Sequence, residues 1–504
     1  MELLESAVPV SRSRLWRLQR DYFDRTSVAA WGQGPVPLHV TSNPLIARAY
    51  VQILLGYFRD LAAAGELDAA SPLYVMELGA GSGRFSYLFR RALDELLARS
   101  IFHDLRVVLI MTDFVAANVE HWRGREEFSA SIAAGNLDFA LFDLEHDQSL
   151  HLLQSNLTLT PGTPKNPMIF IANYVFDGIP QDVFRIENGV AEEFLAQLQH
   201  DGDQNFSVEF QRKPISPDHY PDPALNNILA SFLTRSGTIS MPVAALACLR
   251  NLRALSSGRM LLLTADKGYG EATLKANASA PIVAQHGSCS MMVNFAALGQ
   301  WVRAHGGAEF HPAHAPTALY AAAFAFGLET FPECNLAYSS AIDHGGPDDF
   351  TALPAAAALC GNALSWDQAI NLLRLSGWDN QLLPDLLPIF RTQLDTASPE
   401  QIAALHQAIE QLDGRYFPIG ESHDLAFDLG VLLLQTGAYH AAAAQFHKSQ
   451  HRFGADASCL INLALCYWRT NRPRDASKIL TAGLRCDPTN PTGLLLQKHL
   501  EPAL

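Results

Sequence analysis

A glycine-rich turn at residues 77–83 constrains the fold of this chain more than any other feature. The turn reads Glu-Leu-Gly-Ala-Gly-Ser-Gly; it follows the apolar run 74–78 and precedes an amphipathic segment that continues to about residue 98. A buried strand that runs into such a turn and then into a helix directs backbone N–H groups and the positive end of the helix at a ligand. Glycines are needed because a Cβ atom would block close approach of the backbone or would disfavour a positive φ angle.

Strands and helices alternate after this turn. Apolar runs of strand length occur at 107–112, 139–142, 168–172, 260–264 and 319–326, and helical segments at 243–255 and 295–305. Short apolar strands that alternate with helices are typical of a parallel, doubly wound sheet. We therefore expect an α/β, Rossmann-like sheet in a domain at residues 71–330.

Residues 1–70 are expected to form an N-terminal helical part of this domain. Residues 12–65 have helical periodicity with one break at 32–37. The stretch Thr41-Ser42-Asn43-Pro44 is typical of a helix start, because polar capping residues precede a proline at the first helical position. Four arginines alternate with apolar residues near the start, which indicates an amphipathic helix with a solvated face: Arg12, Arg14, Arg17 and Arg20.

Two stretches have no clear period. Residues 186–235 are polar, and we expect them to form a less regular insertion in the domain. Residues 331–364 are rich in Gly, Pro and Asp, and we expect a linker there. The remaining residues, 365–504, have the pattern of an all-α domain.

A repeat occurs within this helical part, at about residues 422–490. Leu429-Gly430, Gly437, Ala442 and Phe446 recur 34 residues later as Leu463-Ala464, Asn471, Ala476 and Leu480. Thirty-four residues is the period of tetratricopeptide repeats, in which small residues let paired helices pack closely. Stacked helix pairs offer a concave surface, so we expect these repeats to bind a protein partner or substrate.

The composition limits the class of protein. A chain of 504 residues is expected to form two or three domains, and 48% hydrophobic against 17% charged residues indicates folded domains. With 36 basic and 51 acidic residues, the net charge of −15 gives no general attraction to nucleic acid or to a membrane surface. The seven cysteines form no metal-ligand spacing, and residues 1–20 lack the apolar core of a signal peptide. We expect a cytoplasmic protein without a metal site.

Three kinds of ligand compete for the glycine turn. A P-loop would need Gly-Lys-Ser/Thr at the end of the turn, and this sequence is missing. The dinucleotide-binding motif G-x-G-x-x-G has its third glycine at the position that Arg84 occupies here. An acidic residue at Glu77 would repel a phosphate but suits a cationic amine. S-adenosylmethionine carries an ammonium and a sulfonium group and no phosphate, so the charge of the turn favours this cofactor over a nicotinamide dinucleotide.

Acidic residues also end the next strands. Asp113 follows the run 107–112, where a carboxylate can accept both ribose hydroxyls, and Asp143 follows the run 139–142, where it could accept the adenine amino group. Either acid could instead be a helix cap or a solvated loop residue. The predicted cofactor-binding residues are Glu77, Gly79, Ala80, Gly81, Gly83, Asp113, Phe114, Asp143 and Asn173.

The strand at 168–172 leads into the stretch Asn173-Tyr174-Val175-Phe176-Asp177-Gly178-Ile179-Pro180. In this architecture the stretch faces the methyl group. Asn173 could orient an acceptor by hydrogen bonds, while Tyr174 could exclude water from the site. Asp177 could hold a cationic acceptor or could cap the next turn. We therefore expect these three residues to be catalytic.

Together these segments resemble class I methyltransferases and, more narrowly, the MidA-like family linked to mitochondrial complex I assembly. Family motifs are similar to four stretches here, in the same order: Thr41–Pro44, Glu77–Gly83, Asn173–Pro180 and Asp266-Lys267-Gly268-Tyr269-Gly270. A further family segment is similar to residues 286–298. The resemblance covers residues 35–310 and implies an S-adenosylmethionine-dependent methyltransferase.

The sequence departs from the family at the acceptor side. Members that methylate a protein arginine carry Glu where this chain has Tyr174, and Glu where it has Pro44. A guanidinium acceptor needs a carboxylate to orient it, so the resemblance does not extend to arginine methylation. Two readings follow: a methyltransferase that acts on a protein or peptide recruited by the repeats, or an inactive methyltransferase-like scaffold that binds a partner through them.

Overall fold

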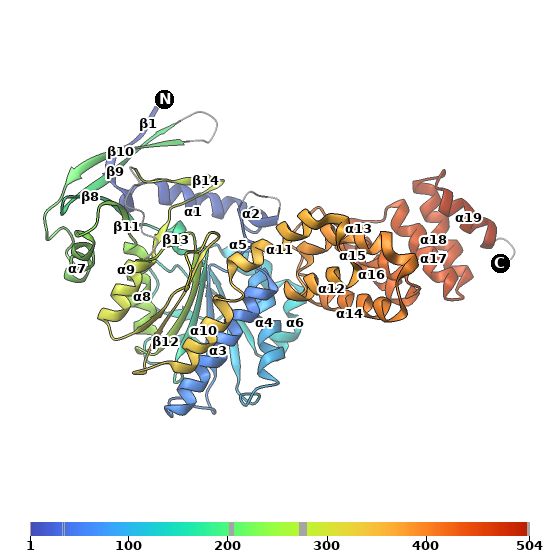
Figure 1. The fold of residues 1–504 in the computed structure, drawn as a ribbon, viewed down its shortest axis with the longest axis horizontal. Coiled ribbons are helices and arrows are strands. Elements are labelled where there is room, and N and C mark those ends of the chain that lie inside the picture. The colour runs from blue at the N-terminus through green and yellow to red at the C-terminus, as the bar shows by residue number, and fades with distance from the viewer. Residues whose placement is uncertain (1, 33, 35, 201–205, 272–279, 501–504) are drawn as a thin grey trace. The chain divides into compact units, whose positions relative to one another are not determined.

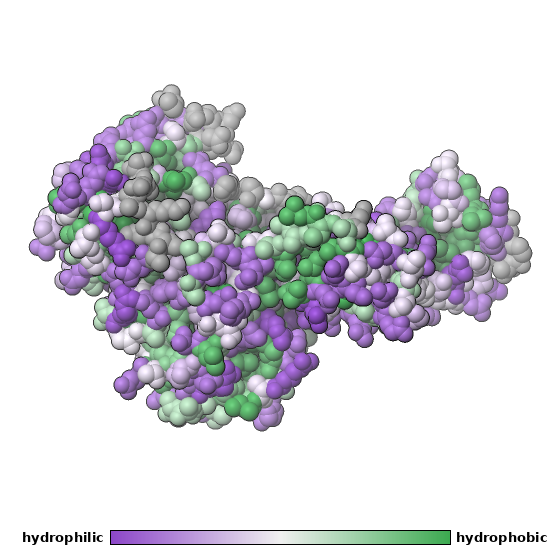
Figure 2. Space-filling model, viewed as in Figure 1, coloured by the Kyte–Doolittle hydropathy of each residue, from purple (hydrophilic) through white to green (hydrophobic). Residues whose placement is uncertain are grey.

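A computed structural model describes residues 2–32, 34, 36–200, 206–271 and 280–500 (Figure 1). The chain divides into two compact units, residues 1–351 and 352–504. Figure 2 shows both hydrophilic and hydrophobic areas on the visible face.

Unit 1 is built around a seven-stranded sheet of order β17-β18-β12-β7-β2-β3-β4. Strands β12, β7, β2, β3 and β4 are parallel neighbours, and β18 runs antiparallel between β12 and β17. The strands are β2 (Leu73–Leu78), β3 (Val107–Asp113), β4 (Leu137–Leu141), β7 (Met168–Asn173), β12 (Met260–Asp266), β17 (Ala308–Phe310) and β18 (Tyr320–Phe326). The expected α/β sheet is confirmed.

Helices connect these strands and cover the sheet (Figure 1). Every residue of β2, β3, β12 and β18 is buried, as continuous apolar runs require when both faces of a sheet are covered. The connecting helices are α4 (Arg84–Leu97), α5 (Ala116–Arg123), α6 (Ser129–Ala133), α8 (Val243–Leu255) and α9 (Phe295–Ala304). Three short strand pairs lie in the loops: β5 (Leu150–His151) with β6 (Thr158–Leu159), β13 (Gly268–Tyr269) with β16 (Val293–Asn294), and β14 (Ala284–His286) with β15 (Ser288–Ser290).

The strand order reverses between β2 and β7. The chain proceeds from β2 to β3 and β4 on one side and then returns to β7 on the other. In open α/β sheets, ligands bind at the carboxyl ends of the strands at such a switch point. Leu78 pairs with Ala172, so the glycine turn and Asn173 leave the sheet side by side.

A second, antiparallel sheet corrects two expectations. Its order is β1-β9-β8-β11, with β10 also paired to β9. Residues 186–235 therefore form an ordered sheet and a helix rather than an irregular insertion, although residues 201–205 lie outside the described part of the chain. The N-terminal part also contributes a strand, which the helical expectation for residues 1–70 missed. The elements are β1 (Glu2–Pro9), β8 (Asp182–Glu187), β9 (Val190–His200), β10 (Phe206–Pro214), α7 (Pro223–Phe232) and β11 (Gly237–Met241).

The physical reason lies in the burial pattern of β9. Its residues alternate between buried and more exposed positions, which is the pattern of an antiparallel strand with one solvated face. Because the residues on that face are polar, the segment has no continuous apolar run, and the sequence did not predict the strand. The buried side packs with Val10, Leu15 and Trp16 in one apolar cluster.

Three N-terminal helices follow β1: α1 (Leu15–Thr26), α2 (Ala29–Gly32) and α3 (Pro44–Ala63). The predicted start of α3 is confirmed, because the Asn43 side chain accepts a hydrogen bond from the Ile46 N–H at 2.9 Å and Pro44 is the first helical residue. The arginine face of α1 is only partly solvated, since Arg20 lines a pocket. The expectation that all four arginines face solvent is therefore wrong for Arg20.

The stretch expected as a linker carries two helices, α10 (Pro332–Ile342) and α11 (Pro347–Cys360). Pro332 and Pro347 stand at the first position of these helices, where proline is favourable, while Pro354 lies inside α11. Acids occupy the first turn of each helix, where the helix dipole favours them: Glu333, Asp348 and Asp349. Helix α10 is held against α3, because the Asp60 carboxylate accepts hydrogen bonds from the Glu333 and Cys334 N–H groups at 3.0 and 2.8 Å.

Unit 2 is helical beyond the end of α11. Its helices are α12 (Trp366–Leu375), α13 (Leu383–Gln393), α14 (Pro399–Arg415), α15 (Leu425–Gln435), α16 (Tyr439–Phe453), α17 (Ala457–Arg469), α18 (Pro473–Cys486) and α19 (Pro491–Leu500). The pair α15–α16 and the pair α17–α18 occupy the 34-residue repeat. Gly437 and Asn471 hold the same place in the two turns, and both have a positive φ, of 81° and 57°.

Close packing of the first helix pair depends on a glycine. A Cβ atom on Gly430 would lie 2.8 Å from the Phe446 ring, so the small residue lets α15 approach α16. Among the helices that the structure describes, none has the length and apolar character needed to cross a membrane.

Candidate functional site

A pocket with about 700 Å³ of empty space, part of it open to solvent, lies at the carboxyl ends of the central strands. Its floor comes from the glycine turn after β2 and from the loops after β3, β4 and β7. Helices α1 and α2 supply a further wall. The lining residues include Gln19, Arg20, Phe23, Trp31, Gly79, Asp113, Phe114, Asp143, Glu145 and Tyr174.

The glycine turn has the backbone conformation that the sequence predicts. Gly79, Gly81 and Gly83 have φ angles of 61°, 54° and 80°, a region that L side chains rarely adopt. Gly83 caps helix α4. A Cβ atom on Gly81 would lie 2.8 Å from the Trp31 ring, so this glycine is needed for space as well as for its φ angle.

Glu77 lies beside the turn but is not among the residues that line the pocket. It is 4% exposed, and its carboxylate accepts a hydrogen bond from the Ser86 hydroxyl on α4. Burial raises the pKa of Glu77 to about 7, the negative charge of Asp113 adds to the increase, and the Ser86 hydrogen bond opposes it. Glu77 thus contributes a buried acid behind the turn.

Asp113 ties the glycine turn to the end of β3. Its Oδ2 accepts hydrogen bonds from the Gly81 N–H at 3.2 Å and from Asn118 Nδ2 at 3.0 Å, and its Oδ1 accepts one from the Val115 N–H at 3.0 Å. Burial raises the pKa of Asp113, and these hydrogen bonds oppose the increase. The carboxylate therefore lines the pocket in a fixed orientation, with Phe114 next to it.

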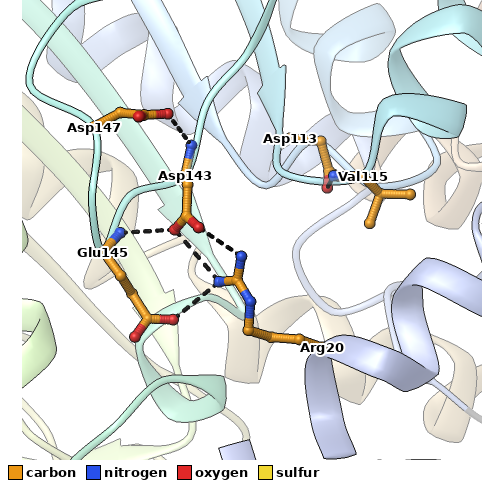
Figure 3. Close-up of polar contacts among 6 residues, drawn as sticks. All are labelled: Arg20, Asp113, Val115, Asp143, Glu145 and Asp147. Atoms are coloured by element: carbon orange, nitrogen blue, oxygen red, sulfur yellow. Dashed lines mark hydrogen bonds and ion pairs between the residues drawn. The ribbon is translucent and has the colours of Figure 1, made fainter. Parts of the chain in front are cut away.

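Asp143 follows β4 and is bound by an arginine from the first helix. Figure 3 shows Arg20 of α1 reaching Asp143 and Glu145. The Arg20 guanidinium donates to Asp143 Oδ2 at 2.6 Å and Oδ1 at 3.3 Å and to Glu145 Oε1 at 3.0 Å, and it lies 4.3 Å above the Phe114 ring centre. The Glu145 N–H also donates to Asp143 Oδ1 at 3.0 Å.

Asn173 ends strand β7 and is oriented by helix α3. Its Oδ1 accepts a hydrogen bond from the Tyr50 hydroxyl at 2.8 Å. Its Nδ2 is buried and has no hydrogen-bond partner among the described residues. Buried donors are rarely left unpaired, so this amide group is suited to a ligand oxygen.

Tyr174 has a strained backbone, with a φ of 54°, and its N–H donates to the Ala265 carbonyl at 3.0 Å. Its side chain lines the pocket, and burial raises the pKa of its hydroxyl. Positive φ angles in bulky residues persist only where the surrounding structure imposes them, and such residues cluster at functional sites.

Asp177 lies three residues further and forms a buried pair with Asp266, outside the pocket lining. The Asp177 N–H is 3.4 Å from Asp266 Oδ1. Burial raises the pKa of Asp177 to about 6, while the positive charge of Lys267 opposes the increase. Burial and the neighbouring Asp177 raise the pKa of Asp266 well above its usual range. The two buried carboxylates therefore disfavour the state in which both are ionised.

Helices α1 and α2 supply pocket residues that the sequence did not indicate: Gln19, Arg20, Phe23 and Trp31. Gln19 bonds to residues 173–180, here called the acceptor stretch, and to β15: it donates to the Gly178 carbonyl at 3.2 Å and accepts from the Cys289 N–H. The Trp31 ring stacks on Phe23 with centroids 5.5 Å apart. The one available signal was the helical spacing of Phe23 with Gln19 and Arg20.

A metal centre finds no support in the described part of the chain, where no group of three or more His, Cys, Asp or Glu residues could hold an ion. The predicted residues that line the pocket are Gly79, Asp113, Phe114, Asp143 and Tyr174. The other predicted residues are not in its lining: Glu77, Ala80, Gly81, Gly83, Asn173 and Asp177.

A match to a family model identifies this chain as an S-adenosylmethionine-dependent methyltransferase. The model of the family described as "Putative S-adenosyl-L-methionine-dependent methyltransferase" matches residues 61–312, half of the 504 residues, and the chain belongs to this family. Its cofactor is S-adenosylmethionine. No curated protein matches the sequence.

Two solved structures from Burkholderia thailandensis are similar in fold. One is a superfamily member bound to S-adenosyl-homocysteine, and the other is the native crystal form of an uncharacterized superfamily protein. Each is 15% identical in sequence, with a TM-score of 0.41, and the match covers 68% of this chain and 85% of the solved one.

The polar groups of the pocket suit the charged groups of S-adenosylmethionine. Acidic side chains suit a ligand with ammonium and sulfonium groups, and Gly79 of the turn lines the pocket beside them. Asn173 Nδ2, which has no partner in the described part of the chain, is available as a donor to a ligand oxygen.

Proposed function

We propose that this chain transfers the methyl group of S-adenosylmethionine to a protein or peptide acceptor that its helical unit recruits. One observation carries the proposal: the switch point between β2 and β7 joins the glycine turn, Asp113 and the Asn173-Tyr174 stretch at one pocket edge. The cofactor supplies an electrophilic methyl group. The protein's part is to bind, orient and dehydrate the reactants.

The cofactor-binding residues follow from this arrangement. The backbone of the glycine turn is assigned to close contact with the cofactor, through Gly79, Ala80, Gly81 and Gly83. Glu77 contributes negative charge behind this backbone. Asp113 is assigned to the ribose hydroxyls, because its carboxylate lines the pocket in an orientation fixed by three donors.

The adenine end is assigned to Phe114 and Asp143. The Phe114 ring lines the pocket, and Asp143 Oδ atoms can accept the adenine amino group. A carboxylate has about four acceptor positions, so contacts with Arg20 and the Glu145 N–H leave room for another donor.

Asn173, Tyr174 and Asp177 are assigned to the acceptor. Asn173 orients the reacting group through its Nδ2, which has no partner among the described residues, and the half-buried Tyr174 excludes water. The Asp177–Asp266 pair suits an acceptor that carries or releases a proton, such as an amine. Methyl transfer from a sulfonium is an in-line displacement, for which positioning supplies much of the acceleration.

Recruitment is assigned to the helix pairs α15–α16 and α17–α18. Their 34-residue period, small packing residues and matching turns at Gly437 and Asn471 support tetratricopeptide repeats. The order of motifs supports a place in the MidA-like group.

The test is calorimetric titration of S-adenosylmethionine into Asp113→Ala and Gly79→Val variants. We expect each variant to weaken S-adenosylmethionine binding about tenfold or more. Asp113→Ala removes a buried charge-assisted contact, and Gly79→Val fills space in the pocket. Asp104→Ala is the matched control for the aspartate, since the Asp104 side chain is 93% exposed. Gly65→Val controls for backbone strain, because Gly65 has a φ of 71° and open space around it. Unchanged binding in both test variants would refute the pocket assignment.

Recruitment is tested with tritiated cofactor and a fractionated proteome. The full chain is expected to label a protein that a chain ending at residue 351 does not label. Cofactor affinity should be the same for both chains. Labelling by the shorter chain would show that the helical unit does not select the acceptor.

A further inference from the structure

The Arg20 side chain stands out among the groups that line the pocket. It is the one basic side chain in the described lining, beside the three acids Asp113, Asp143 and Glu145. It bonds to Asp143 and Glu145 at once (Figure 3). Its guanidinium also lies 4.3 Å from the centre of the Phe114 ring.

These ion pairs are not ordinary surface contacts. The side chains of Arg20, Asp143 and Glu145 are 33%, 21% and 17% exposed, so solvent screens them less than a fully exposed pair. The guanidinium fork also makes two contacts with Asp143, which fixes its position. Arg20 therefore neutralises much of the negative charge at the adenine end of the pocket.

The cofactor and its product differ in charge. S-adenosylmethionine carries a sulfonium, an ammonium and a carboxylate, which leaves one net positive charge. After methyl transfer the sulfur is neutral, so S-adenosylhomocysteine has no net charge. A negative pocket therefore favours the cofactor over the product, and a neutralised pocket favours it less.

We propose that Arg20 is the resident counter-ion of this pocket and sets how strongly the site discriminates between the cationic cofactor and the neutral product. The proposal rests on the cofactor site assigned above. With Arg20 in place, Asp143 and Glu145 act mainly on the guanidinium. Without it, their charge acts on the sulfonium and ammonium groups of the cofactor.

Arg20 is thus a specificity-determining residue that acts from outside the sheet. Its helix also carries Gln19, which bonds to the Gly178 carbonyl in the acceptor stretch. Helix α1 therefore contacts the acids of the adenine end with one residue and the acceptor stretch with its neighbour.

The experiment compares the affinities of S-adenosylmethionine and S-adenosylhomocysteine for the full chain by calorimetry. In Arg20→Met, which keeps an apolar stem over Phe114, we expect the product-to-cofactor ratio of Kd values to rise about three- to tenfold. The rise should shrink as salt increases. Arg20→Lys keeps the charge and is expected to retain most of the wild-type ratio. Arg20→Gln is a second neutral variant, should the methionine variant fold poorly.

Arg17→Met is the matched control, because it makes the same charge change at an exposed position of α1. Its ratio should equal that of the wild type. An unchanged ratio in the neutral Arg20 variants, or an equal loss of affinity for both ligands, would overturn the proposal. Asp113→Ala separates the proposed role of Arg20 from the assignment of the pocket. If Asp113→Ala lowers the affinity for both ligands while the Arg20 variants leave the Kd ratio unchanged, the pocket assignment is supported and the role of Arg20 is refuted. If Asp113→Ala changes the affinity for neither ligand, the pocket assignment itself is refuted.

Discussion

The Tyr50 hydroxyl donates a hydrogen bond to Asn173 Oδ1 at 2.8 Å and so connects helix α3 to the end of strand β7. Tyr50 is 2% exposed, and burial raises the pKa of its hydroxyl, so it remains a donor at every physiological pH. The contact fixes which face of the Asn173 amide is free. Its Nδ2 is left next to the glycine turn as a donor without a partner among the described residues.

Tyr50→Phe is expected to weaken S-adenosylmethionine binding about fivefold, because the loss of one hydrogen bond costs about 1 kcal/mol and lets the Asn173 amide rotate. Tyr57→Phe is the matched control: Tyr57 lies on the same helix, is buried and bonds to the Phe326 carbonyl at 3.4 Å. Both variants should lose similar thermal stability, measured by circular dichroism. Equal cofactor affinity in the two variants would show that Tyr50 does not orient Asn173 for the ligand.

The central strands and the glycine turn could be predicted from the sequence because local physics determines them. Strands buried on both faces are continuous apolar runs, and the left-handed φ angles at Gly79, Gly81 and Gly83 require glycine. The cap at Asn43 is likewise a contact within four residues. Each of these features needs no knowledge of a distant partner.

The features that the sequence did not reveal depend on distant partners. Strand β9 has a polar face, and its pairing with β1 joins residues almost 200 positions apart, such as Glu2 and His200. An arginine on an amphipathic helix can face solvent or a pocket, and for Arg20 only the packing of α1 decides. The direction of the Glu77 carboxylate also depends on packing, because helix α4 brings Ser86 to it from nine residues away.

The buried Glu77 predicts a pH dependence of stability. Its pKa of about 7 in the folded chain lies above the usual value of 4.5, so the folded state binds this proton more tightly than the unfolded state. The contribution of Glu77 to stability is therefore fully present below about pH 4.5 and is lost as pH rises to about 7. Glu77→Gln keeps an acceptor for Ser86 and removes the charge.

We expect Glu77→Gln to be more stable than the wild type at pH 8, by on the order of 2–3 kcal/mol, and nearly equal to it at pH 5. The measurement is the free energy of unfolding in urea at several pH values. Glu120→Gln is the control, because the Glu120 side chain is 67% exposed. A difference between variant and wild type that does not change with pH would contradict a raised pKa at Glu77.

The helix repeat predicts that two positions 34 residues apart respond alike to the same substitution. Gly430 and Ala464 occupy equivalent places in α15 and α17; Ala464 is fully buried, and a Cβ atom on Gly430 would already meet the Phe446 ring at 2.8 Å. Gly430→Leu and Ala464→Leu are each expected to destabilise unit 2 by about 1–3 kcal/mol, since overpacking forces helices apart. Ala444→Leu, at an exposed position of α16, is the control and should change stability little.

Hydrogen exchange resolved by peptide measures this effect within the full chain. In both overpacked variants, protection should fall in the helix pairs between residues 425 and 486, while the peptides of β2 and β3 keep theirs and S-adenosylmethionine affinity stays within about twofold. If Gly430→Leu loosens its helix pair and Ala464→Leu does not, the two pairs do not pack as equivalent repeats. In that case the tetratricopeptide assignment, and with it the proposed route of acceptor recruitment, would have to be abandoned.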